Sequence, residues 1–434
     1  MKHRSPSPRA GRQFGVGLLA LSLASPLAAQ EPPSNEELAR RVDALSQELE
    51  DLRLGQSGTA RADQVQHGMG PAASKIYRTE EGVSLGGYGE MVYSNFSSTD
   101  DRGAPSNATD EIDFLRGVFY FGYRFDENWI FNSELEFEHA STSASGSTSI
   151  EFAWVEYKMS TALRARTGML LVPMGFINEL HEPTTFLSAS RPLTERVIIP
   201  STWGENGLGI WGEAGPAEEF SYRLYLVNSF DASGFSASGL RGGRQKGSQA
   251  AAEDFALTGR LDWQGLDGLL LGGSFYTGDS GQGMTGAGGP ISAGTAIYEL
   301  HAQYNLGGLQ LRGLYTMATV DDVAALNANL GLAGNASVGE EMSGWYLEAG
   351  YDVLAHLENT EASLMPFVRV EQVNTQEKVP QGFSADPAND QEILTLGITW
   401  QPFPQGILKF DWQNYDNAAG TGVDRFHLAL GYVF

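Results

Sequence analysis

The chain has 434 residues, no cysteine and a formal net charge of −25. The lack of cysteine excludes disulfides, thiolate metal sites and a lipid anchor attached to a cysteine. The acidic balance argues against a nucleic-acid partner, because nucleic-acid binding needs basic patches.

Residues 1–29 are predicted to be a secretory signal peptide. Basic residues precede an apolar run from Phe14 to Leu27, and Ala28 and Ala29 provide a small-residue cleavage site. The run is shorter than the ~20 residues that a membrane-spanning helix needs. Cleavage after Ala29 would take the formal charge from −25 to −29, because it removes four positive charges and no negative ones.

Residues 30–56 are predicted to form a coiled-coil helix, because apolar residues recur there at spacings of four and three, the a/d seam of a heptad repeat. The seam consists of Leu38, Val42, Leu45, Leu49 and Leu52. The helix either trimerises or tethers the protein in the periplasm, or it packs its apolar stripe on another surface. Residues 57–81 are polar and contain glycine, and are predicted to be a linker.

From Val83 onward the apolar period changes to two, which predicts β-strands. In residues 129–138, for example, apolar side chains share one face, while Asn132, Glu134, Glu136 and Glu138 share the other. About 16 such segments begin near residues 83, 112, 128, 149, 162, 206, 218, 254, 267, 293, 308, 340, 363, 391, 406 and 424. Each has on the order of 10 residues, the length of a tilted strand that crosses a membrane.

The connections between these segments alternate between short and long. Short ones lie at 126–127, 160–161, 215–216, 265–266, 306–307 and 403–404. Long ones cover roughly 98–110, 140–148, 173–205, 229–253, 278–292, 320–339, 373–390 and 415–422. Short turns at one end and long loops at the other are typical of outer-membrane barrels. The sequence therefore predicts an all-β fold, a transmembrane antiparallel β-barrel of about 16 strands over residues 82–434, surrounded by outer-membrane lipid.

The last predicted strand supports the barrel. Phe426, Leu428, Leu430, Tyr432 and Phe434 share one face, and the other face is small or polar. This pattern resembles the closing strand of a bacterial outer-membrane barrel, in which a terminal Phe belongs to the signal for the barrel-assembly machinery. The resemblance implies that machinery as a partner through Phe434. Aromatic residues near strand ends, among them Trp129, Trp211 and Trp400, are predicted to form interfacial girdles.

Residues 166–205 carry a more specific motif, Gly168, Pro173 and Gly175 in a Gly-x-x-x-x-Pro-x-Gly stretch that leaves a strand and enters the third long loop. This region resembles the phosphate-selective porin O/P family. The resemblance implies a barrel of 16 strands, a homotrimer and a third loop (about 173–205) folded into the pore as a constriction. The chain departs from the family in its lysines, which are few and scattered outside the signal peptide.

Period-two parity places many charged residues on the lumen side of the barrel. The candidates for the constriction and lumen are Glu134, Glu136, Glu138, Arg164, Arg166, Glu179, Glu182, Arg191, Arg196 and Glu205. They either steer ions and small polar solutes or neutralise one another across neighbouring strands. The predicted function is a water-filled porin for passive diffusion of such solutes, with a mild preference for cations. An anion- or phosphate-selective porin is the alternative.

The sequence gives little support to other kinds of function. Glu179, His181 and Glu182 could supply zinc ligands, but a hydrogen-bonded loop explains the same residues, and neither a metal nor a cofactor is predicted. None of the histidines belongs to a serine-hydrolase or metalloprotease motif, so an enzyme is not predicted. An envelope tether acting through the N-terminal helix is compatible with a pore.

Overall fold

The computed structural model describes residues 67–143, 146–357 and 360–434. The predicted signal peptide, the predicted coiled-coil helix and the first part of the predicted linker lie outside these residues. No helix in the described part of the chain is both long and apolar enough to cross a membrane.

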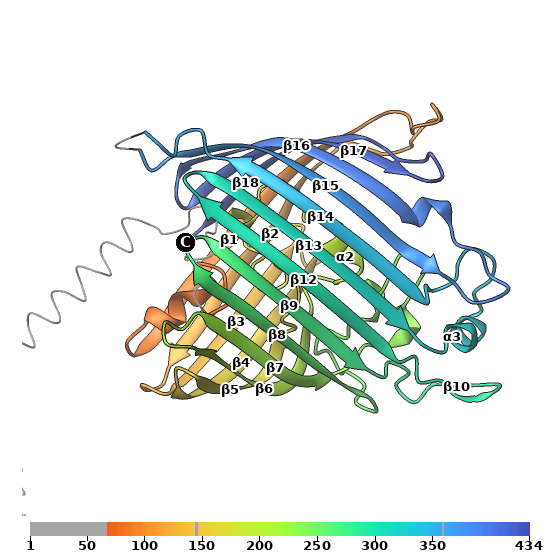
Figure 1. Cartoon of the computed structure of the whole chain (residues 1–434), viewed down its shortest axis with the longest axis horizontal. Coiled ribbons are helices and arrows are strands. Elements are labelled where there is room, and N and C mark those ends of the chain that lie inside the picture. Colours follow the sequence, from red (N-terminus) through yellow and green to blue (C-terminus); the bar gives the residue numbers. More distant parts are fainter. Residues whose placement is uncertain (1–66, 144–145, 358–359) are drawn as a thin grey trace, which may run out of the picture. The chain divides into compact units, whose positions relative to one another are not determined.

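Sixteen strands form one closed antiparallel barrel (Figure 1). They are β1 (Gly82–Phe96), β2 (Glu111–Arg124), β3 (Trp129–Glu138), β4 (Ser147–Ser160), β5 (Leu163–Leu171), β6 (Gly204–Ala214), β7 (Phe220–Asn228), β8 (Phe255–Leu266), β9 (Leu269–Gly278), β12 (Thr295–Leu306), β13 (Leu309–Val320), β14 (Glu341–Tyr351), β15 (Ser363–Lys378), β16 (Asp390–Phe403), β17 (Gly406–Asn417) and β18 (Arg425–Val433). The predicted fold class is confirmed, and every predicted strand start lies within two residues of the observed one.

The period-two pattern decides which side chains face outward. Along β18, Leu428 is 52% exposed, whereas His427 and Ala429 on either side are buried. Closure occurs where β18 pairs with β1, and the backbone N–H of Phe434 donates to the carbonyl of Gly87 at 2.9 Å. A closed barrel leaves no unpaired strand edge, which is the condition for a sheet to lie in lipid.

The connections define two different ends of the barrel. One end, the short-turn end, carries tight turns such as the one between β2 and β3, and the other, the long-loop end, carries the long connections (Figure 1). The turn between β14 and β15, residues 352–362, is longer than its neighbours at the short-turn end. The remaining elements lie in the long loops: η3 (Pro183–Thr185), α2 (Thr194–Val197), η4 (Ala232–Gly234), η5 (Arg241–Gly243), the hairpin β10 (Thr285–Gly286) and β11 (Gly289–Pro290), α3 (Val323–Leu330) and η6 (Pro387–Asn389).

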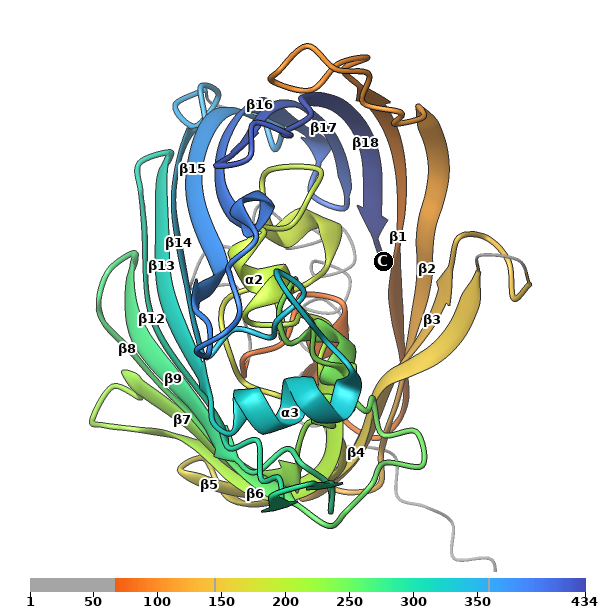
Figure 2. The ribbon, with the colours of Figure 1, turned by 90° about the vertical axis from the view of Figure 1, so that its right-hand side faces the viewer.

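Two segments lie within the ring of strands (Figure 2). Loop 3, residues 172–203, contains η3 and α2 and fills much of the interior. The second is residues 67–81, here called the mouth segment, which contains η2 (Ala73–Arg78) and packs on the inner faces of β1, β2 and β3. The sequence predicts a linker there, but Ser74 and Ile76 are fully buried.

The long loops add an apolar core between loop 3 and the long-loop end of the barrel. Trp203 of loop 3 stacks on Phe230 with ring centroids 4.4 Å apart, and Tyr276 of β9 packs against both rings. Val323 and Leu326 of α3 belong to the same buried cluster. This core fills the side of the long-loop end that β6–β9 enclose.

Candidate functional site

Loop 3 leaves β5 through a backbone that requires glycine. Gly168 has φ +133°, and a Cβ there would lie 2.3 Å from the carbonyl oxygen of Ala153. Gly175 has φ +66°, and its Cβ would lie 2.3 Å from a carboxylate oxygen of Glu195. Residues that carry a Cβ atom rarely adopt either backbone conformation. Gly168 therefore allows the close approach of β5 to β4, and Gly175 allows the start of loop 3 to pass beside Glu195.

Strands β15 and β17 hold loop 3 through charged side chains that form hydrogen bonds with its backbone. The N–H of Ala189 donates to Asp411 at 2.6 Å, and the N–H of Leu193 donates to Glu371 at 2.7 Å. Lys409 Nζ donates to the carbonyl of Ser188 at 3.0 Å. Asp411, Glu371 and Lys409 are buried, so these wall charges serve as anchors for the loop and are not water-facing.

A second charged cluster surrounds Glu156 on strands β4, β5 and β6, here called the near wall. Arg166 Nη2 lies 2.8 Å and Arg164 Nη1 lies 3.3 Å from this carboxylate. Trp211 Nε1 donates to it at 2.8 Å, and the Arg164 guanidinium lies 4.5 Å from the centre of the Trp211 ring. The girdle prediction for Trp211 is therefore wrong. Its side chain is 1% exposed and points inward, where its indole N–H donates to the Glu156 carboxylate of the ion pair.

The acidic candidates on β3 are also paired. Glu134 accepts from His181 of loop 3, with the nearest oxygen 3.0 Å from Nε2. Glu136 lies 3.1 Å from Arg116 Nη1. Glu138, at the end of β3 and half-buried, accepts from Ser147. Neutralisation by neighbours thus explains Glu134 and Glu136.

The acidic residues of loop 3 have separate partners. Glu179 lies 3.1 Å from Arg223 Nε, and Glu182 accepts from the N–H groups of Ala72 and Ala73 at 3.0 Å each. Glu205, at the start of β6, accepts from Asn228 at 2.7 Å. Within the described residues, no group of three or more His, Asp or Glu side chains is placed to hold a metal ion. The hydrogen-bonded loop accounts for Glu179, His181 and Glu182.

Four arginines gather at the long-loop end and are here called the arginine group: Arg191 and Arg196 of loop 3, with Arg241 and Arg244 of the loop after β7. Burial, followed by repulsion from Arg244, Arg191 and Arg196, lowers the pKa of Arg241 to about 9. Nη2 of Arg191 is buried with no hydrogen-bond partner within the described residues. Arg241 and Arg244 donate to the carbonyl of Ser201 in loop 3. Arg196 is exposed, and the other three side chains are partly exposed.

Arg241 and Arg244 were missed by sequence reasoning. Parity assigns inward positions only to strand residues, and these two lie in a long loop expected to face solvent. The signal that could have found them is local: Arg241-Gly-Gly-Arg244 places two cations around a flexible pair in an otherwise acidic chain. Acids at the edge of this region, Glu138 and Glu151, provide the opposite charge.

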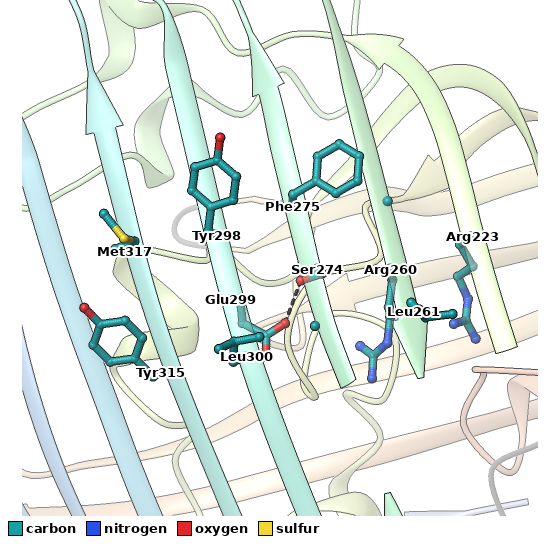
Figure 3. Close-up of a pocket in the computed structure, with 12 residues that line it drawn as sticks. Arg223, Arg260, Leu261, Ser274, Phe275, Tyr298, Glu299, Leu300, Tyr315 and Met317 are labelled. Carbon is teal, nitrogen blue, oxygen red and sulfur yellow. Dashed lines mark hydrogen bonds between the residues drawn. The ribbon is translucent and has the colours of Figure 1, made fainter. Parts of the chain in front are cut away.

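Two hollows lie elsewhere on the barrel. A cavity of about 100 Å³ lies under loop 3 near the short-turn end, between His67, Glu179, Trp211, Arg223, Asp262 and Arg312. A groove of about 480 Å³ lies over glycines 259 and 273, with Leu261, Phe275, Tyr298 and Leu300 along its sides (Figure 3). Its exposed apolar rim belongs to the outer wall, so the groove is not part of a path through the barrel.

Sequence comparison finds a relative that spans most of the chain. No protein-family model matches the sequence. An uncharacterized protein of Aquifex aeolicus (strain VF5) is 37% identical over 378 residues, covering 85% of this chain and 83% of that protein.

Solved structures share the barrel at low identity. OmpF of Salmonella typhi, in complex with daunomycin, matches with a TM-score of 0.55 and 11% identity, covering 82% of this chain and 98% of OmpF. The outer membrane channel DcaP of Acinetobacter baumannii matches with a TM-score of 0.52 and 10% identity, covering 81% and 97%. The trimer form of OmpT of Vibrio cholerae matches with 0.51 and 10%, covering 82% and 100%. At these identities the likeness shows the fold alone.

Proposed function

The chain belongs to one family with the Aquifex aeolicus protein, and from this membership together with the porin-like fold we propose that it is an outer-membrane porin for ions and small polar solutes. The observation that carries the proposal is a closed barrel with a long loop anchored inside it, because such a barrel encloses a polar path across lipid. The proposal includes export by the 1–29 signal peptide and assembly as a homotrimer, which OmpT of Vibrio cholerae supports by its trimer form.

In this proposal loop 3 is the constriction, and the arginine group lies at its accessible edge. Lumen charges that are buried in ion pairs hold the loop, and the charges that retain exposure act on passing ions. Fields from external loops are screened within about 10 Å at 0.1 M salt, so charge at the narrow part sets the selectivity.

One observation favours anion passage as the second candidate. The sequence predicts a mild cation preference from its −29 mature charge, but Glu179 and Glu182 of loop 3 are buried and bonded to protein groups. The arginine group keeps its exposure. Cation preference and anion preference give opposite signs for the reversal potential.

Single-channel recording of the purified protein in planar bilayers tests the proposal. We expect ohmic channels, and in a tenfold KCl gradient a reversal potential whose sign separates cation from anion preference. Arg191→Gln with Arg244→Gln should shift that potential toward cations, whereas Arg102→Gln, in an exposed loop, should leave it unchanged. A folded protein that gives no current, shown folded by heat-modifiable gel mobility, would refute the porin.

A further inference from the structure

Residues 67–81 occupy the interior of the barrel at its short-turn end, where a passive pore has no need of a plug. Ile76 packs against β2, so closely that a Cβ on Gly122 would lie 3.0 Å from its Cδ1. The segment crosses from β6, where His67 lies 2.9 Å from Glu213, to the inner faces of β1–β3. It therefore covers the part of the mouth that these strands enclose.

Side chains of the wall hold this segment in place. Asn132 Nδ2 donates to the carbonyl of Ala73 at 3.0 Å, and Arg124 Nη2 donates to the carbonyls of Ile76 and Tyr77 at 3.2 Å each. Such bonds can break one at a time, whereas each barrel strand is bonded along both edges.

Tyr77 ties the segment to the near-wall charges. Its hydroxyl accepts from Arg166 Nη2 at 2.8 Å and donates to Glu156 at 3.1 Å. Both partners also bond to each other, so they remain satisfied when the tyrosine leaves. Arg166 and Glu156 therefore stay paired without the segment, and the segment gains two charge-assisted bonds by docking.

Loop 3 contacts the segment from above. The Glu182 carboxylate is 1% exposed and accepts from the N–H groups of Ala72 and Ala73, which are the free donors at the start of η2. Glu182 lies next to His181, which is bonded to Glu134 of β3. Movement of the segment thus changes the surroundings of the loop proposed to form the constriction.

Few large apolar side chains oppose release. Residues 68–74 read Gly-Met-Gly-Pro-Ala-Ala-Ser, and the large side chains that the segment packs into the interior are Met69, Ile76 and the partly buried Tyr77. Burial of three such side chains contributes far less than the closed ladder of the barrel. The segment can leave while the barrel remains intact.

We propose that the mouth segment is a displaceable inner gate: docked, it narrows the short-turn end, and released, it opens a wider channel. The gate rests on the proposed porin function and adds to it two conductance states of one barrel. The occupant of the inner mouth is the chain's own residues 67–81.

A thiol-labelling experiment on the full chain measures the release directly. The chain has no cysteine, so Ser74→Cys introduces one thiol at a fully buried position of the segment. We expect slow labelling by a membrane-impermeant maleimide, and labelling about tenfold faster when Tyr77→Phe removes the two charge-assisted bonds. Ser233→Cys, exposed in a long loop, is the control and should label rapidly and equally in both backgrounds.

A reversible lock links the gate to current. Ile76→Cys with Gly122→Cys places two thiols in the contact between η2 and β2. After oxidation we expect only the smaller conductance level, and after reduction of the same protein both levels; each single-cysteine variant should ignore the oxidant. Equal currents in the oxidised and reduced protein, or labelling of Ser74→Cys unaffected by Tyr77→Phe, would overturn the gate and leave the porin standing. Absence of current in every folded variant would instead refute the porin.

Discussion

The wall of the barrel and loop 3 inside it are built by different bonds. Neighbouring strands are held by backbone ladders, such as the eleven consecutive pairs between β13 and β14. Loop 3 is held by buried apolar side chains such as Ile198 and Ile199, and by single contacts between its backbone and charged side chains of the strands, among them Asp411, Glu371 and Arg369. Backbone pairing therefore fixes the strands, whereas side-chain contacts fix the position of the loop.

The largest effect should follow when a buried charge that serves both regions is removed. Arg369 is 1% exposed, lies 2.8 Å from Glu371 and 3.4 Å from Glu348, and donates to the carbonyl of Ser190 at 3.2 Å. Arg369→Met leaves two buried carboxylates without their cation, a change that costs about 3–5 kcal/mol. The midpoint of urea unfolding, followed by heat-modifiable gel mobility, should fall accordingly, and channel currents should become noisy as loop 3 loosens.

The outward neighbour Val370 provides the matched control. It is 37% exposed on the outer face of the barrel, so Val370→Ile should leave both the midpoint and the current noise unchanged. A loss below ~1 kcal/mol for Arg369→Met would show that loop 3 does not depend on this charge.

The next largest effect should come from a substitution on the outer face of the barrel. Leu347 lies in the middle of β14 and is 59% exposed, whereas the next residue, Glu348, is buried inside. Leu347→Arg places a cation in lipid, which costs about 2–4 kcal/mol at mid-depth. The same unfolding assay should show this loss, and Leu347→Ile should not. An arginine tolerated at this position would mean that this face of the barrel does not meet lipid.

The wall was predictable because its signal is repeated. Period-two alternation and the parity of turns and loops gave every strand start within two residues, since each strand must bury one face and expose the other. Trp211 shows where this reasoning stops: its place near a strand end is compatible with a girdle, and only the inward direction of its side chain reveals its bond to Glu156.

For the interior, the sequence predicts which residue types face inward, but not which residues they contact. The third loop was expected inside from the Gly168, Pro173 and Gly175 motif, but no spacing tells that Ala189 meets a carboxylate 222 residues later. The polar and small residues of the mouth segment predict a linker, whereas its burial comes from Tyr77 and Ile76, whose partners lie on distant strands.

A pH effect should distinguish the mouth segment from the rest of the interior. Burial raises the pKa of Glu182 to about 7 from 4.5, although the N–H groups of Ala73 and Ala72 oppose the shift. The His181 pKa is also raised, because Glu134 outweighs the effect of burial. The partner that raises the His181 pKa, Glu134 of β3, stays in place when the segment leaves, whereas release that hydrates Glu182 returns the pKa of this carboxyl toward 4.5. Docking is then favoured at low pH and weakens as pH rises from about 4.5 through 7.

The other titratable groups near Glu182 are Lys75 of the segment and Tyr120 of β2. We expect Ser74→Cys to label faster at pH 8 than at pH 5 after correction for thiol ionisation with Ser233→Cys. In Glu182→Gln, which keeps an acceptor without a titrating proton, most of this difference should disappear. An unchanged difference in Glu182→Gln would assign the pH effect to His181.

The smallest effect concerns a charge that neither region uses for packing. Arg196 is exposed, so Arg196→Gln should leave the unfolding midpoint within ~0.5 kcal/mol of the parent, in contrast to Arg369→Met. Its guanidinium nevertheless belongs to the arginine group, so the reversal potential in a KCl gradient should move toward cation preference. The shift should be larger at low salt, because ions screen an exposed charge within about 10 Å at 0.1 M. Arg102→Gln, an exposed loop arginine paired with Asp100, should leave the potential unchanged. If Arg196→Gln and Arg102→Gln behaved alike, the accessible charges of loop 3 would have no special role, and selectivity would depend on the buried wall pairs.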